Sequence, residues 1–377
     1  MDLYLHIGTE KTGTTSVQKF FRANRDVLAR NGIFYPAAPG NQNHMGLAVA
    51  AQRSSKRAPL RKSVGVRSED DVEKFRADLA RDLAAELSGG AYETVVMSGE
   101  HCSSRLLEDD EVRWLKEFLS PFFDRIHIVV YIRRQDDYLL STYSTAVKSG
   151  ATGPLHLPPE KTIRHRYDHW NLLSRWARVF GRENIVCRKF EKSALRSGDI
   201  VDDFLDAAAI DGNRGYRRPA NVNESLDAET LEFLRLFNGH IPRFAKGGIN
   251  PERNNIVSLL SKVSQGPLVT LPDDELARFM ALFEDTNRQV AMEYFGGVRS
   301  APGDPLFEPR ADPRERTRAV KLTAERAVEF CAWLWREKQA QVERLSGGRK
   351  KRQAGQAPLR KRRRRQGAAM AENAEPQ

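Results

Sequence analysis

The sequence predicts an α/β protein with a central parallel sheet flanked by helices, followed by a helical C-terminal half. Over about the first 190 residues, short apolar runs rich in β-branched side chains alternate with segments of helical periodicity. This alternation is typical of parallel strands joined by helices that cover both faces of a sheet. From about residue 199 onward the periodicity is helical, so the second half is expected to pack as helices.

The individual elements follow from runs, periodicity and stop signals. In the α/β part, strands are expected at 3–8, 33–36, 93–98, 126–132 and 184–190, and helices at 14–30, 69–90, 112–119, 136–150 and 167–181. The helix at 69–90 is the clearest of these, because its apolar residues recur at helical spacing, Ser68 can cap its start and Gly89 can end it. In the second half, helices are expected at 225–240, 273–295 and 323–345.

The basic charge of the chain is concentrated at its end. Residues 349–377 carry ten Lys/Arg and two Glu, a net charge of +8 out of the +11 of the whole chain. The segment has no aromatic residue and a single Leu, so it cannot bury enough apolar surface to fold. We expect 347–377 to be a disordered basic tail, either a solubilising extension or a contact for an acidic polymer or a membrane surface. Charge confined to a tail does not indicate specific nucleic-acid binding.

Cysteine content and hydropathy favour a cytoplasmic location. The three cysteines are scattered, which predicts neither a disulfide framework nor a metal site. Apolar runs are far shorter than the ~20 residues that span a bilayer. The chain starts directly on a strand-like run, without the pattern of a signal peptide.

The stretch HIGTEKTGTTSVQ, residues 6–18, follows the first expected strand. Gly8 and Gly13 have the spacing of a triphosphate-binding loop, but Thr14 and Thr15 stand where that loop has Lys followed by Ser or Thr, and the lysine lies upstream as Lys11. The glycines allow the backbone to approach a ligand, and the amides that open the helix can point at a phosphate. The sequence therefore predicts an anion site at the end of the first strand.

A second cationic site follows the strand IHIVVYI, which runs into Arg133 and Arg134 rather than into the aspartate that would hold Mg²⁺. A cation at the end of this strand suits a second anion and repels Mg²⁺. Ligands of α/β sheets bind beyond the carboxyl ends of the strands, so the two sites suit one ligand with two separated phosphates.

EKTGTTSVQ resembles the 5′-phosphosulfate-binding loop of the sulfotransferases that use 3′-phosphoadenosine 5′-phosphosulfate (PAPS). YIRRQDDYLLSTY is similar to the 3′-phosphate-binding segment of that family, with Arg133 at the strand end and Ser141 eight residues later. The resemblance, closest to bacterial members, implies a P-loop-like sulfotransferase fold. It implies a domain over 1–346, with a donor-binding core at about 1–210 and a helical remainder at about 211–346.

The resemblance further implies metal-independent, in-line transfer of a sulfuryl group from PAPS to an acceptor hydroxyl or amine, leaving adenosine 3′,5′-bisphosphate (PAP). Tyr167 is expected either to stack on the adenine or to be a core tyrosine. The other donor-binding residues implied are Lys11, Thr12, Gly13, Thr14, Thr15, Arg133 and Ser141. Lys11 is also implied in catalysis, because it can neutralise charge on the leaving 5′-phosphate.

The family places a catalytic base, His or Glu, between its two donor motifs. The run VVMSGEHCSS offers Glu100 and His101, and His44 is a third candidate that can line the acceptor entrance. We favour Glu100, because Ser-x-Glu after a strand resembles bacterial and glycan-directed members. His101 is the alternative that resembles the small-molecule enzymes.

Two other functions are kept open: a P-loop nucleotide kinase or NTPase, which requires ATP with Mg²⁺, and a non-catalytic anion-binding protein of the same fold. The acceptor is expected to be a carbohydrate or glycoconjugate. The support is the basic stretch with Gly and Pro at 35–67, because long loops often shape substrate clefts. A flexible insertion is the alternative interpretation of that stretch.

Overall fold

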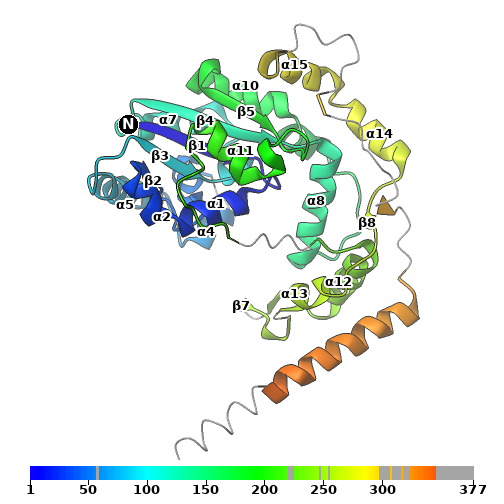
Figure 1. Cartoon of the computed structure of the whole chain (residues 1–377). Coiled ribbons are helices and arrows are strands. Elements are labelled where there is room, and N and C mark those ends of the chain that lie inside the picture. The colour runs from blue at the N-terminus through cyan, green and yellow to red at the C-terminus, as the bar shows by residue number, and fades with distance from the viewer. Residues whose placement is uncertain are drawn as a thin grey trace, which may run out of the picture. The chain divides into compact units, whose positions relative to one another are not determined.

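A five-stranded parallel sheet lies at the centre of the first of two units into which the chain divides (Figure 1). The computed structural model describes residues 1–56, 59–219, 225–245, 248–253, 255–296, 306–307, 316–317 and 322–344. The first unit comprises Met1–Thr145, Pro154–Asn223 and Thr270–Pro313, and the second comprises Ala146–Gly153, Glu224–Val269 and Arg314–Gln377.

The sheet has the strand order β2-β3-β1-β4-β5, with every neighbouring pair parallel. Its strands are β1 (Asp2–Gly8), β2 (Ile33–Phe34), β3 (Thr94–Ser98), β4 (Arg125–Ile132) and β5 (Ile185–Lys189). The predicted fold class, a central parallel sheet flanked by helices, is confirmed. Because β1 is paired with both β3 and β4, the segments that follow these three strands meet at one edge of the sheet.

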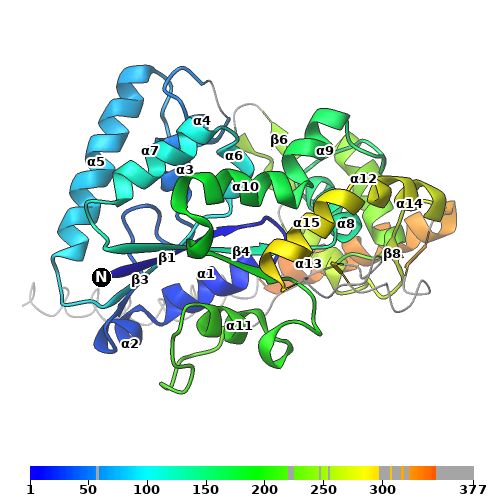
Figure 2. The same cartoon turned by 90° about the horizontal axis from the view of Figure 1, so that it is seen from above.

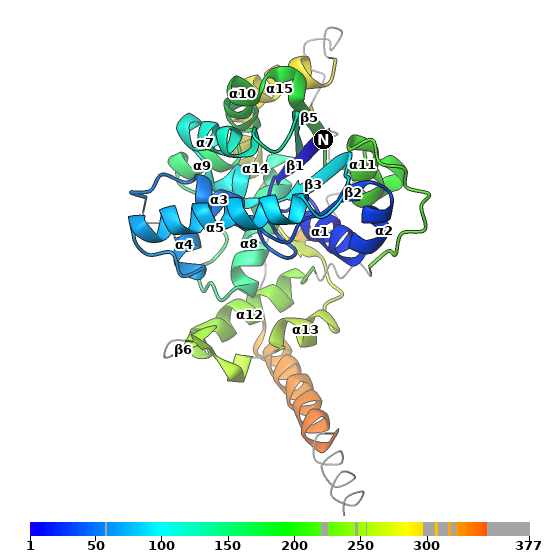
Figure 3. The ribbon, with the colours of Figure 1, turned by 90° about the vertical axis from the view of Figure 1, so that its left-hand side faces the viewer.

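Alternating side chains of the strands bury against different helices. Leu5 of β1 and Ile128 of β4 lie in one core cluster with α3, α5, α7 and α10, whereas Val129 and Tyr131 lie in another with α1, α2 and α11. Figures 2 and 3 show the same division, with α1, α2 and α11 on one side of the sheet. The period of two along a strand produces these two cores.

The helices of the first unit agree with the predicted ones in most places. They are α1 (Thr14–Ala23), α2 (Arg25–Arg30), α3 (Met45–Ala51), α4 (Pro59–Ser63), α5 (Glu69–Leu87), α6 (His101–Arg105), α7 (Asp109–Leu119), α8 (Gln135–Lys148), α9 (Glu160–Arg166), α10 (His169–Phe180), α11 (Ile200–Ala207), α14 (Asp273–Ala281) and α15 (Glu284–Tyr294), with 3₁₀ turns η1 (Arg182–Asn184) and η2 (Arg196–Gly198); α8 continues into the second unit. Ser68 caps α5 in a capping box with Asp71, as the start signal predicts.

Several segments differ from the prediction. The expected helix at 14–30 is broken at Asn24, whose side-chain amide donates to the carbonyl oxygens of Phe20 and Arg217 at 2.8 and 2.9 Å. The expected helix at 273–295 is likewise two helices, α14 and α15. The stretch 35–67 contains α3, whose residues are nearly all buried, so it is not an open loop.

The second unit is largely helical. Its elements are the end of α8, α12 (Ala228–His240), the antiparallel pair β6 (Phe244–Ala245) and β7 (Gly248–Ile249), η3 (Pro251–Arg253), α13 (Ile256–Ser261), the parallel pair β8 (Leu268–Val269) and β9 (Arg316–Thr317), and a helix at 324–344. Phe233 of α12 and Phe330 of the last helix have ring centroids 5.1 Å apart. The helices that the sequence predicts at 225–240 and 323–345 are therefore present in this unit, whereas α14 and α15 belong to the first.

The basic tail expected at 347–377 lies outside the described residues. The proposed boundaries of the domain, its core and the tail stay predictions. Within the described part of the chain, none of the helices combines the length and apolar character needed to cross a bilayer.

Candidate functional site

The loop between β1 and α1, residues 8–15, is called the phosphate loop below. Within it, Gly13 directly precedes the first residue of α1, has a left-handed conformation (φ 76°) and provides no side-chain cap. A Cβ atom at Gly13 would lie 3.1 Å from side-chain atoms of Ile200 and Phe190, so both the conformation and the space favour glycine. The uncapped first turn of α1 leaves backbone amides that an anion can accept from.

Arg133 connects the phosphate loop to the end of β4. Its guanidinium Nη1 donates to the carbonyl oxygen of Lys11 at 2.9 Å, and Lys11 has φ 68°. Burial and the neighbouring Arg133 guanidinium lower the pKa of Lys11, although the carboxylates of Glu10 and Glu100 act in the opposite direction. Two cations from motifs more than 100 residues apart in the sequence therefore lie beside one loop.

The threonines of the phosphate loop differ in what they can offer to a ligand. The Thr12 hydroxyl donates to the carbonyl oxygen of Thr9 at 2.7 Å, and Thr12 is fully buried. Thr14 opens α1 and is nearly buried, whereas Thr15 is exposed. Thr12 therefore shapes the loop from inside, and the side chain of Thr15 is the accessible one.

Ser141 and Tyr167 lie apart from the phosphate loop in the chain but in the same unit. Ser141 is half-buried in α8, six residues after the helix begins at Gln135, which is about 9 Å along the axis. Tyr167 is 2% exposed and packs on Tyr138 and Phe279, with ring centroids 5.1 and 5.5 Å away. This is the position of a core tyrosine, and stacking on an adenine would require its ring to leave the cluster.

Glu100 follows β3 and directly adjoins the phosphate loop. A Cβ atom built at Gly8 would lie 3.1 Å from the Cβ of Glu100. Its Oε2 accepts from the Gln18 side-chain amide at 2.7 Å and its Oε1 from the Asn43 side-chain amide at 2.8 Å. These two amides fix the carboxylate at the edge of the sheet where the phosphate loop and Arg133 lie.

His101 begins α6 and lies close to the carboxylate of Glu10. Its Nδ1 is 4.0 Å from Glu10 Oε1 and, among the described residues, has no hydrogen-bond partner. Burial raises the pKa of the Glu10 carboxyl, but the neighbouring Arg166 and Arg105 guanidiniums and the Ser104 hydroxyl outweigh it, so this pKa lies below its ordinary value. Glu10 therefore stays ionised beside His101.

His44 is fully buried, and both of its ring nitrogens are engaged by the backbone. The Ser98 amide donates to Nδ1 and Nε2 donates to the Pro36 carbonyl oxygen, each at 2.9 Å. Burial lowers the pKa of His44 to about 3. This geometry gives His44 a structural role and does not favour it as the catalytic base.

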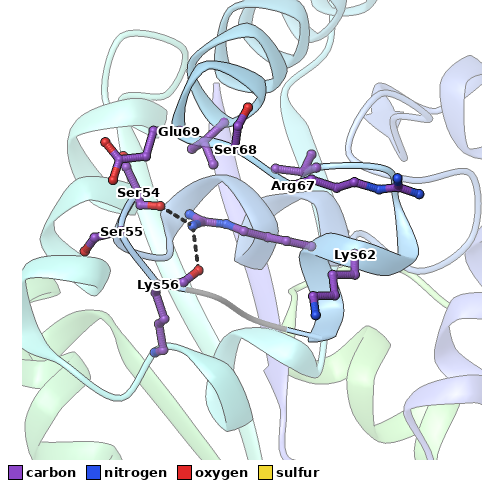
Figure 4. Close-up of a pocket in the computed structure, with 10 residues that line it drawn as sticks. Ser54, Ser55, Lys56, Lys62, Arg67, Ser68 and Glu69 are labelled. Atoms are coloured by element: carbon purple, nitrogen blue, oxygen red, sulfur yellow. Dashed lines mark hydrogen bonds between the residues drawn. The ribbon is translucent and has the colours of Figure 1, made fainter.

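The basic stretch at 35–67 reaches the site through Asn43 and also forms a separate hollow of about 320 Å³. Figure 4 shows Lys62 and Arg67 at one end of this hollow and Ser54 and Lys56 at the other. The buried Arg61 donates to the carbonyl oxygens of Ser54 and Lys56, both at 3.1 Å. Neither Glu100 nor any residue of the phosphate loop is among the described residues that line this hollow. The hollow is therefore separate from the candidate site.

Sequence reasoning missed the residues that position the predicted ones. Gln18, Asn43 and Glu10 are polar residues in ordinary surroundings of the sequence, and no spacing rule connects them to Glu100 or to Arg166. Their role depends on which strands are neighbours, which a single sequence does not give. One such contact is the ion pair between Glu10 and Arg166, which joins the phosphate loop to α9.

The arrangement combines an uncapped helix start, Lys11, Arg133 and a carboxylate at one edge of the sheet. The first three can bind anionic oxygens, and the carboxylate can accept a proton. The residues present therefore fit a phosphate-bearing ligand that reacts with a proton-donating partner.

Comparison with known proteins gives the following relatives. No family model matches the chain. An uncharacterized protein of Archaeoglobus fulgidus is 28% identical over 197 residues, which are 50% of this chain and 51% of that protein. The chain thus spans about half the length of this curated relative. Among solved structures, a sulfotransferase from Alicyclobacillus acidocaldarius is similar with a TM-score of 0.36 and 14% identity, over 62% of this chain and 93% of that one.

Proposed function

We propose that the protein is a sulfotransferase that moves a sulfuryl group from PAPS to an acceptor hydroxyl or amine. The observation that carries the proposal is the hydrogen bond from Arg133 to the carbonyl oxygen of Lys11. It joins the two segments that resemble the donor-binding motifs, so their cations lie beside the same uncapped helix start. Such a pair of anion sites suits a donor with separated phosphate groups.

In this proposal the chain binds the donor from two neighbouring strand ends. The backbone amides at 13–15 and the Lys11 ammonium bind the 5′-phosphosulfate, where they stabilise charge that develops on the leaving phosphate. Arg133 and Ser141 bind the 3′-phosphate, with the Arg133 guanidinium as the bidentate partner. No metal ion has a role in this scheme.

Glu100 is proposed as the base. It accepts the proton of the acceptor hydroxyl while the acceptor oxygen forms a bond to sulfur and the bond from sulfur to the 5′-phosphate oxygen breaks. The amides of Gln18 and Asn43 hold both carboxylate oxygens in place. Such positioning lowers the cost of bringing base and acceptor together. The acceptor is proposed to be a carbohydrate or glycoconjugate.

Calorimetric titration tests the donor assignment. We expect PAP to bind with a micromolar dissociation constant and ATP with Mg²⁺ not to bind. Arg133→Ala should lose PAP binding, because it removes the cation and frees the Lys11 carbonyl. Arg125→Ala is the matched control, because Arg125 lies at the opposite end of the same strand and pairs with Asp2.

The other results assign the alternatives. Binding of ATP with Mg²⁺ but not of PAP would favour a kinase or NTPase. Binding of PAP without transfer to any acceptor, and without hydrolysis of PAPS, would favour a non-catalytic anion-binding protein.

A further inference from the structure

A hollow of about 240 Å³ adjoins the phosphate loop within the first unit. Its lining includes Thr9 of the loop and Ser103 and Ser104 of α6. Ser103 and Ser104 follow Glu100 by three and four residues, and the Ser103 hydroxyl donates to the Glu100 carbonyl oxygen at 2.9 Å. The hollow is therefore one short segment away from the proposed base.

A second hollow of about 560 Å³ adjoins the first, because Leu107 and His165 line both. The two hollows, lined mainly by residues of α6, α7, α9 and α10 and the turns between them, are together called the groove below. Pockets that enclose drug-sized ligands are typically ~300–1,000 Å³. The first hollow is smaller than that range and suits one ring, whereas the whole groove suits a chain of several rings.

Cations predominate in the first hollow of this groove. The first hollow is lined by Arg105, Lys161 and Arg166, and no carboxylate is among its described lining residues. Arg166 is paired with Glu10, and Arg105 is 3.9 Å from it. Lys161 has no ion pair among the described residues and is exposed.

The second hollow is lined by four arginines and by the three carboxylates of Glu108, Asp109 and Asp110, and two of the arginines are paired. Arg178 pairs with Asp109, and a similar pair joins Arg53 to Asp110. Arg113 is exposed and forms no ion pair within the described residues. Lys161 and Arg113 thus place one cation with accessible charge along each of the two hollows.

Other polar groups of the groove suit a hydroxylated ligand better than nucleobases. The buried Nδ1 of His165, at the junction of the two hollows, has no hydrogen-bond partner among the described residues. Tyr138 is the single aromatic side chain other than His165 in the described lining, and it is 2% exposed. Stacking platforms of the kind that bind single-stranded nucleic acid require accessible aromatic faces.

We propose that this groove binds an anionic oligosaccharide, with Lys161 and Arg113 contacting carboxylates or sulfates on successive sugar units. That this oligosaccharide is the acceptor rests on the proposed sulfotransferase function, whereas its binding to the groove does not.

Binding of one charged and one uncharged trisaccharide to the full chain, each measured with and without saturating PAP, tests the proposal. Trigalacturonate and maltotriose are both trimers of six-membered sugar rings, but only the first carries carboxylates. We expect trigalacturonate to bind at least ~10-fold more tightly by calorimetry, and added salt to weaken it. Lys161→Ala and Arg113→Ala should each weaken it about 3- to 10-fold, as for an exposed charge-assisted contact.

Arg164→Ala is the matched control, because Arg164 is an exposed cation of α9 that pairs with Glu160 and does not line either hollow. Equal binding of the two trisaccharides, no detectable binding, or an equal effect of Arg164→Ala would each overturn the proposal. Tighter binding of a single-stranded oligonucleotide would replace the saccharide by nucleic acid. If trigalacturonate binds but PAP does not, the sulfotransferase assignment is contradicted and the groove proposal stands, because Lys11, Arg133 and Ser141 do not line the groove.

Discussion

Side-chain hydrogen bonds hold the carboxylate of Glu100 in one position, which suits a group that accepts a proton. Both oxygens of its carboxylate accept from side-chain amides, those of Gln18 and Asn43, and the Gln18 amide also donates to the Ser98 hydroxyl at 3.3 Å. His101 has no comparable fixation, because its nearest ionic partner is 4.0 Å away. The geometry therefore favours Glu100 over His101.

Substitution of these two residues separates their roles. We expect Glu100→Gln, which keeps the shape but cannot accept the proton, to lower the transfer rate ~10²–10⁴-fold. His101→Asn should stay within a few-fold of the parent. Parallel pH–rate profiles of the two variants provide the measurement, and the opposite ranking of the two variants would assign the base to His101.

Lys11 is the second residue whose chemistry can be tested directly. Lys11→Ala should keep the thermal midpoint of the parent, because the side chain is half-buried and not in a core cluster. Transfer should fall ~10²–10³-fold, the usual effect of removing one preorganised donor at a developing charge. Lys19→Ala, a neighbouring lysine of α1, is the control. Full activity of Lys11→Ala in a sulfuryl-transfer assay would exclude the proposed role.

The candidate site was predictable where a local motif specifies it. The positions of the phosphate loop and Arg133 follow from strand ends, and the structure places them together. The contacts of His44 were not predictable, because its two backbone partners lie 8 and 54 residues away. A sequence identifies a histidine as a possible base, but only the fold shows that both of its nitrogens are occupied.

Among the elements, the start of α1 connects the fold to ligand binding. Gly13 has both positive φ and close neighbours, so Gly13→Ala should lower the free energy of unfolding by more than the ~1–2 kcal/mol of a left-handed alanine and abolish PAP binding. Gly65 has a similar φ of 82° and no atom near its would-be Cβ.

Gly65→Ala therefore measures the cost of the conformation alone and should leave PAP binding unchanged. Urea unfolding and calorimetry of the two variants provide the comparison. Equal destabilisation in the two would mean that contact with Ile200 and Phe190 has no part in the effect.

The strands and long helices were predictable because their periodicity extends over many residues. The breaks were not. Asn24 interrupts the predicted helix, because its side-chain amide donates to the carbonyl oxygens of Phe20 and of Arg217, which is 193 residues away. Helix propensities of single residues do not include such long-range hydrogen bonds. Similarly, α3 has too few residues for a clear period, and its burial under α5 and α7 makes it a helix.

For the whole molecule, buried histidines predict how stability depends on pH. Burial lowers the pKa of His6 and of His44 to about 3 and that of His169 to about 4, below the ~6.5 of an unfolded chain. From about pH 6.5 down to these values the unfolded chain binds protons that the folded chain does not. Stability is therefore complete above about pH 6.5 and decreases as the pH falls through this window.

Each such histidine contributes up to ~1.4 kcal/mol per pH unit to the slope of the unfolding free energy. His44→Gln should be less stable overall but should have a slope smaller by about this amount near pH 5, as measured by urea unfolding at several pH values. A slope that is the same in His44→Gln and the parent would refute the assignment.

The order of the strands also has an evolutionary consequence. The phosphate loop and Arg133 follow adjacent strands, β1 and β4, whereas α6, α7, α9 and α10 supply the walls of the groove from other connections of the same sheet. Mutations or length changes in those connections can reshape the groove while the phosphate loop and Arg133 stay constant. Under the proposed function, lineages that diverge from this protein are therefore free to change acceptors without rebuilding the donor site.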